Sequence, residues 1–247
     1  IMGVINANDD SFFGGSRFKG EEAVKKIEQM IEEGANIIDI GGVSSRPGSE
    51  YCGVEEELKR VTPIVKEIYN KNLYQKAIFS IDSFAPEVID LALNNGFKIA
   101  NDITGLVNDE VAKVVGKYNA KVCIMHIKGI PKNMQNNPFY ENVILEVDKY
   151  FEERIEKALK YGIEDIILDV GIGFGKRLED NLQLIKHLEH FKRFGYELLI
   201  GASRKSMIDK IIPTPVEERL AGSLTIHLES LRNGATIIRC HDVKEHK

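Results

Sequence analysis

The stretch AIFSIDSFAPEVIDLALNNGFKIANDIT, residues 77–104, contains the pattern that decides the fold. An apolar run at 77–83 carries Asp82 near its end, a helical stretch follows, and a second apolar run at 98–104 begins shortly after Gly96. Short apolar strands that alternate with helices are typical of a parallel sheet with crossover helices. Glycine is a common helix stop. The stretch therefore predicts one βαβ unit with polar side chains near the strand ends.

The same alternation continues in both directions along the chain. Helical stretches with charges on one face include residues 21–34, 54–69 and 147–162, and several end in glycine. Eight strands with helices between them predict a (β/α)8 TIM barrel in a single domain, residues 1–247, because open doubly wound sheets usually have fewer strands. Only residues 242–247 follow the last strand, so we expect the final helix to be missing and both ends to be trimmed. The predicted strands are residues 1–6, 36–42, 77–83, 98–104, 121–127, 165–171, 197–203 and 236–241.

Composition fits a one-domain barrel and excludes several other classes. The 247 residues are 43% hydrophobic and 29% charged, with a net charge of -5. Acidic and basic residues mix along the same segments, so we expect no nucleic-acid partner. Cys52, Cys123 and Cys240 form no CxxC pair, which favours a reducing compartment. No apolar run approaches the roughly 18 residues of a membrane span, and no signal-peptide pattern is present, so we expect a cytoplasmic protein without a membrane partner.

Nearly every predicted strand ends in a polar or charged residue. In TIM barrels the active site lies where strands finish and βα loops begin. Isolated buried charges are costly unless they are paired, so a core built only for packing would not need them. An ion pair or a helix cap explains any single one equally well, but together they predict a catalytic mouth. The residues are Asn6, Asp39, Asp82, Asn101, Asp102, His126, Asp169, Ser203, Arg204, Lys205, Arg239 and His241.

Eight segments, in order along the chain, resemble motifs of the dihydropteroate synthase family. One alone would be a weak signal, whereas eight in family order at barrel-compatible spacing are highly specific. The resemblance implies a transferase that joins 6-hydroxymethyl-7,8-dihydropterin pyrophosphate to p-aminobenzoate, giving 7,8-dihydropteroate and pyrophosphate in folate biosynthesis. The segments are MGVINANDDSFFGGS (2–16), IDIGGVSSRPGS (38–49), SIDS (80–83), NDITG (101–105), MHIKGIPKNMQ (125–135), LDVGIGFGK (168–176), GASRKS (201–206) and RCHDV (239–243).

The resemblance implies a pterin pocket at the barrel mouth. Asp169 would meet two pterin donors at once in a charge-assisted bidentate pair. Asp82 and Asn101 would complete the polar edge, and Lys205 would donate to the acceptor side. The alternative is that Asp82 and Asn101 only tie strand ends together. Apolar or stacking walls are implied for Ile103, Met125, Phe174 and Arg239.

The resemblance also implies a pyrophosphate site with a metal ion. Arg239 would reach the diphosphate, and His241 projects from the same strand face by the period of two. Arg46 resembles the second-loop arginine that closes over this anion. Asn6 corresponds to the first-loop asparagine of the family, whose side-chain carbonyl would bind magnesium (Mg2+) together with phosphate oxygens and water.

A separate pocket for p-aminobenzoate is implied, formed by Phe12, Ser45, Pro47, Phe174, Lys205 and Ser206. A helix beginning near Ser206 would direct its N–H groups and positive dipole end toward the carboxylate. Because an aniline nitrogen is a weak nucleophile, the hypothesis is that pyrophosphate leaves first. The resulting pterin methylene cation would be stabilised by carboxylates such as Asp82, with no catalytic base or covalent nucleophile. The catalytic residues implied are Asp82, Asp169, Lys205 and Arg239.

Several positions depart from the family pattern. The first loop has Asn8 and Asp9 where Thr-Pro is usual, the second has Val43 in place of Glu, and Val170 replaces Pro. Loss of Pro frees the backbone, and Asp9 adds negative charge near the diphosphate. We expect an active enzyme with an altered first loop. His126 has no implied role, and we interpret it as a buried or supporting histidine.

Three other functions remain open. A pterin-binding methyltransferase barrel would share the pterin residues but would not need the diphosphate residues. A non-catalytic pterin-binding paralogue would bind pterin without releasing pyrophosphate. A phosphate-binding aldolase would use Lys205 as a Schiff-base lysine, although its position after a strand argues against this. By resemblance we also expect a homodimer, formed through the outer helices around the sixth to eighth strands.

Overall fold

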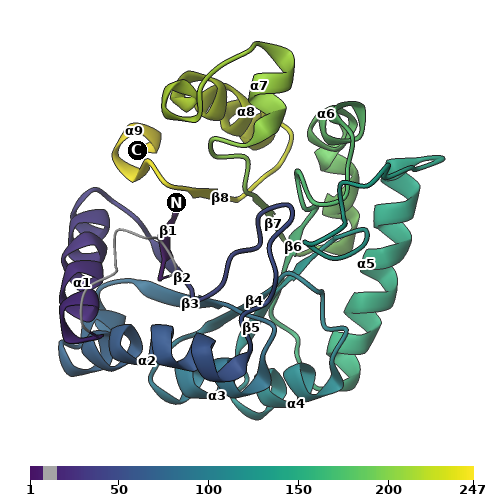
Figure 1. The fold of residues 1–247 in the computed structure, drawn as a ribbon. Helices are drawn as coiled ribbons and strands as arrows, with labels where there is room; N and C mark the ends of the chain where they lie inside the picture. The colour runs from purple at the N-terminus through teal and green to yellow at the C-terminus, as the bar shows by residue number, and fades with distance from the viewer. Residues whose placement is uncertain (8–15) are drawn as a thin grey trace.

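The computed structural model describes residues 1–7 and 16–247, and the side chains of residues 1–7 and 20–247. In these ranges eight parallel strands form a closed barrel in sequence order, with helices outside them (Figure 1). Every strand lies within the range predicted for it, so the TIM barrel is confirmed. The strands are β1 Met2–Asn6, β2 Ile37–Gly41, β3 Ile78–Asp82, β4 Ile99–Asp102, β5 Lys121–Met125, β6 Ile166–Asp169, β7 Glu197–Ile200 and β8 Ile237–Cys240.

The outer layer consists of helices whose ends follow local chemistry. The side chain of Asn142 caps one helix by accepting from the N–H groups of Ile144 and Leu145. Gly162 and Gly234, which follow helices, have φ of 76° and 104°, a region that glycine enters without strain. No helix in the described ranges is long and apolar enough to cross a bilayer. The α-helices are α1 Ser16–Glu32, α2 Val54–Asn70, α3 Pro86–Asn94, α4 Asp109–Lys117, α5 Val143–Lys160, α6 Leu178–Lys186, α7 Ser206–Ile211, α8 Leu220–Arg232 and α9 Val243–His246.

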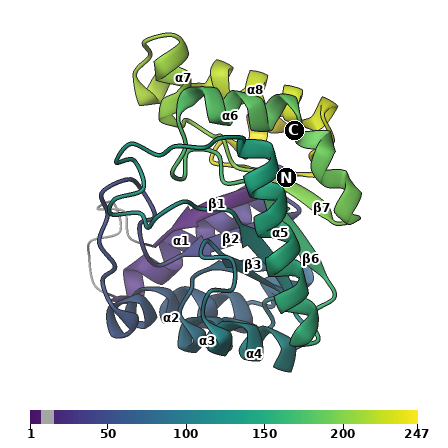
Figure 2. The ribbon, with the colours of Figure 1, turned by 90° about the vertical axis from the view of Figure 1, so that its right-hand side faces the viewer.

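Three short 3₁₀ helices and the one-turn helix α9 complete the described elements. They are η2 Leu73–Gln75, η3 Leu188–Phe194 and η4 Val216–Glu218. After β8 the chain forms α9, which has four residues. Seen from the side, α6, α7 and α8 lie together at one edge of the barrel (Figure 2).

An apolar floor and a polar layer follow one another inside the barrel. The floor is a cluster of seven buried residues, Met2, Ile37, Ile99, Cys123, Ile167, Leu199 and Ile237. Two residues further along four of these strands stand Asp39, Asn101, Asp169 and Arg239. Because side chains alternate with a period of two, these four point into the barrel above the floor. The strand pattern thus gathers charge at the carboxyl ends of the strands.

Candidate functional site

Arg239 joins two carboxylates from different strands in the polar layer. Its Nε donates to Asp39 Oδ2, and a terminal nitrogen donates to Asp82 Oδ2, both at 2.7 Å. The side-chain amide of Asn101 donates to the same Asp39 oxygen at 2.9 Å. Asp39 is fully buried, and Asp82 has 13% of its side chain exposed. Strands β2, β3, β4 and β8 therefore meet around one cation.

The two carboxylates of this network share a single guanidinium. Burial raises the pKa of Asp82 to about 7; the positive charge of Arg239 opposes the shift and the negative charge of Asp39 adds to it. Burial alone would lower the pKa of Arg239, but Asp39 and Asp82 raise it. Both carboxylates thus favour the charged form of Arg239, and burial in the barrel disfavours ionisation of Asp82.

Asp39 belongs to this network, although the sequence predicted no specific role for it. It was one of many polar residues near strand ends, and no role followed from that position. In the structure β2 continues to Gly41, and Asp39 lies inside the strand as the common acceptor for Arg239 and Asn101. Its Oδ1 is buried without a hydrogen-bond partner among the described residues. The alternation of β2 was the signal that placed it inside the barrel.

Asp169 and Lys205 lie at the same mouth, on the β6 and β7 side. Asp169 Oδ1 accepts the Gly171 N–H at 2.7 Å, and the residue is buried. Burial raises the pKa of Asp169, while the charges of Lys205 and Arg239 and the Gly171 N–H act in the opposite direction. Desolvation lowers the pKa of Lys205 to about 8, against the attraction of Asp169. Asp169, Lys205 and Arg239 are thus close enough for their charges to shift one another's pKa values, which is expected if they belong to one site.

Phe174 and Lys205 meet where the loops after β6 and β7 approach each other. The Lys205 ammonium lies 4.6 Å from the centroid of the Phe174 ring, a cation–π arrangement. It also donates to the carbonyl of Ile172. Both side chains are half-buried, and Ser206, which begins α7, is exposed. The structure brings together the two residues that the sequence placed in both the pterin and the p-aminobenzoate pockets.

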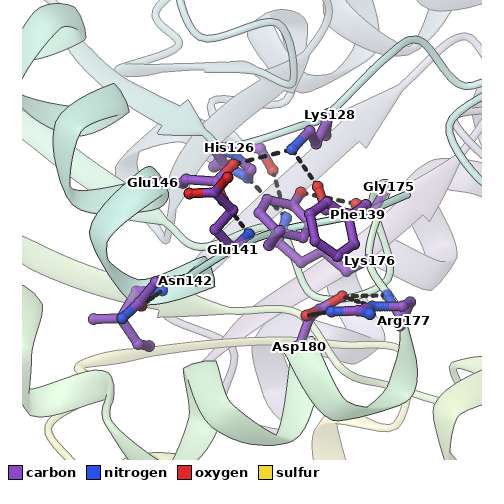
Figure 3. Close-up of polar contacts among 12 residues, drawn as sticks. His126, Lys128, Phe139, Glu141, Asn142, Glu146, Gly175, Lys176, Arg177 and Asp180 are labelled. Atoms are coloured by element: carbon purple, nitrogen blue, oxygen red, sulfur yellow. Dashed lines mark hydrogen bonds and ion pairs between the residues drawn. The ribbon is translucent and has the colours of Figure 1, made fainter. Parts of the chain in front are cut away.

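A buried lysine lies behind this loop, and no role was predicted for it. The Lys176 ammonium is 2.9 Å from His126 Nδ1 and donates to the carbonyls of His126, Gly171 and Phe174 at 3.2, 2.9 and 3.0 Å. Figure 3 shows Lys176 reaching His126. Burial lowers the pKa of Lys176 to about 7 and moves the pKa of His126 well below its usual value. His126 is buried, as interpreted from the sequence.

The loop after β2 carries Arg46, Ser45 and Pro47. Arg46 and Pro47 are exposed, and Ser45 is half-buried. The backbone N–H of Gly48 donates to the carbonyl of Pro131 at 2.9 Å, so this loop rests against the loop after β5. Within the described part of the chain the Arg46 side chain makes no hydrogen bond. The predicted contact between Arg46 and a diphosphate would therefore form only when the ligand binds or this loop moves.

The remaining residues predicted for the site lie at or near the ends of other strands. Asn6 ends β1 and is half-buried, and Ile103 and Met125 are buried. His241 follows β8, is exposed, and has its Nδ1 3.0 Å from Ser203 Oγ. Three residues of the first loop, Phe12, Asn8 and Asp9, lie outside the described residues.

A cavity of about 580 Å³ opens beside Ile103, between the loops that follow β2 to β5 and helix α5. Its walls include the rings of Tyr51, Phe84 and Tyr150, with Arg154 at one side. This size and mainly apolar lining suit part of a small molecule. The cavity borders the loop that carries Ser45, through Ser44 and Ser49.

The chain matches the family model described as "Pterin binding enzyme" over residues 2–241. The chain belongs to the pterin binding enzyme family. Within that family it groups with the dihydropteroate synthases, which are transferases of a pterinylmethyl group, and the resemblance stated from the motifs is confirmed.

Two curated relatives illustrate this grouping. The bifunctional dihydropteroate synthase/dihydropteroate reductase of Helicobacter pylori is 45% identical over 100% of this chain and 65% of its own length. The chain thus spans less than two thirds of that bifunctional protein. The dihydropteroate synthase of Haemophilus influenzae is 41% identical over 98% of this chain and 88% of its own length.

Solved structures agree with the sequence relatives. The Yersinia pestis dihydropteroate synthase, solved with a sulfonamide drug complex, has a TM-score of 0.92 and 37% identity over 99% of this chain and 89% of that one. The Xanthomonas albilineans enzyme, solved with 4-aminobenzoic acid, has a TM-score of 0.89 and 34% identity over 99% and 88%. The barrel and the family membership thus rest on independent comparisons.

Proposed function

We propose that this chain condenses 6-hydroxymethyl-7,8-dihydropterin pyrophosphate with p-aminobenzoate and releases 7,8-dihydropteroate and pyrophosphate. The observation that carries the proposal is the convergence, at one barrel mouth, of buried Asp169, the Asp82–Arg239 pair and Lys205 beside Phe174. A flat heterocycle with a polar edge and an attached anion matches this combination of groups. Relatives named dihydropteroate synthase, similar along the length of this chain, support the same reaction.

In this proposal Asp169 holds the pterin edge. A buried carboxylate that accepts from one backbone N–H keeps further lone pairs for the pterin amine and ring N–H. Asp82 and Asn101 meet the remainder of the edge, and Ile103 and Met125 provide apolar contact. Lys205 donates to the acceptor side of the pterin, which favours its charged form.

The chemical step breaks the bond between the pterin methylene carbon and the pyrophosphate oxygen. The electron pair leaves with pyrophosphate, and positive charge develops on the methylene group and the ring. Asp82 stabilises this charge as a carboxylate, because anionic groups in a water-poor site act strongly on developing charge. The amine nitrogen of p-aminobenzoate then forms the C–N bond and releases one proton to solvent or pyrophosphate. No covalent nucleophile of the protein is needed.

Arg239, His241 and Arg46 bind the leaving pyrophosphate in this proposal, and Asn6 is the magnesium ligand. The fit rests on Asn6 itself, a half-buried amide at an inward-facing position of β1 that makes no side-chain hydrogen bond within the described residues. One protein oxygen joined by phosphate oxygens and waters is a common arrangement for magnesium. When bound, the ion supplies charge stabilisation to the departing diphosphate.

For p-aminobenzoate we propose a pocket between the loops after β2, β6 and β7. Phe174 contacts the ring, while Lys205 and Ser206 meet the carboxylate. Ser45 and Pro47 close the pocket from the loop after β2, and Phe12 would join it from the first loop. The solved relative with 4-aminobenzoic acid shows that an enzyme of similar fold binds this molecule.

We also propose a cytoplasmic homodimer that has no nucleic-acid or membrane partner. Six apolar side chains on or beside α6, α7 and α8 are between 42% and 67% exposed, and burial of such side chains against a second copy would be favourable. Sedimentation of the wild type and of Leu228→Asp tests this, with a monomeric wild type contradicting it. The six residues are Leu182, Ile211, Ile212, Val216, Leu228 and Leu231.

The deciding experiment measures magnesium-dependent pyrophosphate release from the pterin pyrophosphate, with and without p-aminobenzoate. We expect release coupled to dihydropteroate formation, with loss of turnover in Asp82→Ala and Lys205→Ala. Tight pterin binding without pyrophosphate release would instead identify a non-catalytic paralogue. Methyl transfer from methyltetrahydrofolate to a corrinoid protein would identify the methyltransferase alternative.

A further inference from the structure

The loop between β6 and α6, residues 170–176, packs closely against the loop after β5. A Cβ on Gly171 would lie 1.9 Å from the carbonyl oxygen of His126, and one on Gly175 would lie 2.2 Å from that of Lys128. The hydroxyl of Tyr140 donates to the Gly175 carbonyl at 2.8 Å. The loop backbone thus fits its neighbours without room for adjustment.

Lys176 is the side chain that fastens this loop from inside. It is 1% exposed, and its ammonium meets three carbonyl oxygens and one imidazole nitrogen. Two of the carbonyls, of Gly171 and Phe174, belong to the loop, and the His126 contacts belong to the end of β5. The Lys176 nitrogen carries at least two N–H groups whether it is neutral or charged, so it can donate to carbonyls of both segments at once. Other charged side chains that influence Lys176 are Asp169, Lys205, Asp180 and Lys128.

The outer side of the same loop presents the groups proposed to contact p-aminobenzoate. The Ile172 carbonyl accepts from Lys205, and the Phe174 ring lies against the same ammonium. Gly171 and Phe174, the two loop residues bound by Lys176, flank Ile172. A shift of this backbone would therefore move the Phe174 ring and one anchor of Lys205 together.

We infer that Lys176 is a positioning residue that sets the p-aminobenzoate subsite by holding the carbonyls of Gly171 and Phe174 against His126. It touches no substrate and acts through the loop. This inference rests on the proposed function, because it assigns p-aminobenzoate to the Phe174 and Lys205 side of the mouth. Asp82 and Asn101 hold the pterin edge from other strands, β3 and β4. Asp169 accepts the Gly171 N–H and Lys205 also serves the pterin, so we expect a smaller change on the pterin side as well.

The test compares Lys176→Met with Lys128→Met in the full chain. Lys128 is also near His126, but its ammonium is directed outward to the Phe139 carbonyl and to Glu146 (Figure 3). We expect Lys176→Met to raise the KM for p-aminobenzoate about tenfold or more, since small misplacements of binding groups are costly. The KM for the pterin pyrophosphate should change by less than about threefold, and Lys128→Met should change both by less than about twofold.

A double-mutant cycle separates positioning from a general loss of structure. If Lys176 acts through Phe174, the KM effects of Lys176→Met and Phe174→Ala are not additive, because the first loses its effect once the ring is gone. If Lys176→Met does not fold, the Tyr140→Phe variant tests whether fixing this loop sets the p-aminobenzoate subsite. It removes only the hydroxyl bonded to Gly175, and should raise the KM for p-aminobenzoate about threefold with the fold intact.

Two results would overturn the inference. One is a folded Lys176→Met enzyme, or in its absence a Tyr140→Phe enzyme, with unchanged KM for p-aminobenzoate. The other is an equal rise of both KM values, which would mean general damage to the mouth. Failure of the proposed function is a different result, since the wild type itself would then release no pyrophosphate in response to p-aminobenzoate.

Discussion

The loops after β6 and β2 both contribute to the proposed p-aminobenzoate pocket, but the structure holds them in different ways. Residues 170–176 are fastened by the buried Lys176 and by the Tyr140 hydroxyl. In the loop after β2, Arg46 and Pro47 are exposed, and the Gly48 N–H donates to the carbonyl of Pro131 in the loop after β5.

This difference in how the two loops are held suggests different roles for them in binding. A wall that is already fixed loses little freedom when a ring binds to it, so the Phe174 side supplies preorganised contact. An exposed loop is free to close over an anion after binding, as many active-site loops do. In the proposed function, p-aminobenzoate would therefore bind mainly against the fixed loop, residues 170–176, and the open loop after β2 would close over the diphosphate.

Equivalent glycine substitutions should show the largest contrast between the two loops. Gly171 has φ of 67° and would place a Cβ 1.9 Å from the His126 carbonyl, so Gly171→Ala should lower the free energy of unfolding by about 4 kcal/mol or prevent folding. Gly48 has φ of 82°, and no atom of the residues that the structure describes lies within 4 Å of the added Cβ, so Gly48→Ala should cost only about 1 kcal/mol. Urea unfolding measures both, and equal losses would remove the distinction between the loops.

The stability of the fixed loop should depend on pH. The pKa of Lys176 is about 7 in the folded chain, below its value of about 10.4 when unfolded, so between these values the unfolded state binds more protons. Stability from this group therefore rises with pH, by about 2–3 kcal/mol from pH 7 to pH 9. Urea titrations across this range should show the rise in the wild type and in Lys128→Met. A similar rise in Lys176→Met would assign it to other groups.

Arg46→Ala should affect binding without affecting stability. Its side chain is exposed, so the free energy of unfolding should change by less than about 0.5 kcal/mol. If the open loop closes on the diphosphate, the KM for the pterin pyrophosphate should rise about tenfold, the loss of a charge-assisted contact. The KM for p-aminobenzoate should change less. Steady-state kinetics with each substrate varied distinguishes this from an effect shared by both substrates.

The smallest effect is expected at the outer contact of the open loop. Lys132 and Glu50 form an ion pair of 2.6 Å with both side chains more than 60% exposed. Exposed pairs contribute little, so Lys132→Ala should change the free energy of unfolding by less than about 0.5 kcal/mol. A loss above about 1 kcal/mol would show that this loop is held more firmly than its exposure indicates.

Local sequence patterns were sufficient for the fold and for most of the candidate site. Strands of period two and helices that end in glycine are short-range features, so residues 77–104 already contain the repeating unit. Asp82, Asn101, Asp169, Lys205 and Arg239 could be named because the barrel places strand ends at one mouth. The motif order identified the family.

Only the tertiary structure decided which of these groups act on one another. Arg239 is 200 residues from Asp39 and 157 from Asp82, and no local pattern shows that the two carboxylates share it. Lys176 reads in the sequence as one more charged residue before a helix, yet the packing of the β5 and β6 ends buries it against His126. Periodicity is set by neighbours along the chain, whereas burial and charge pairing depend on which segments the closed barrel brings together.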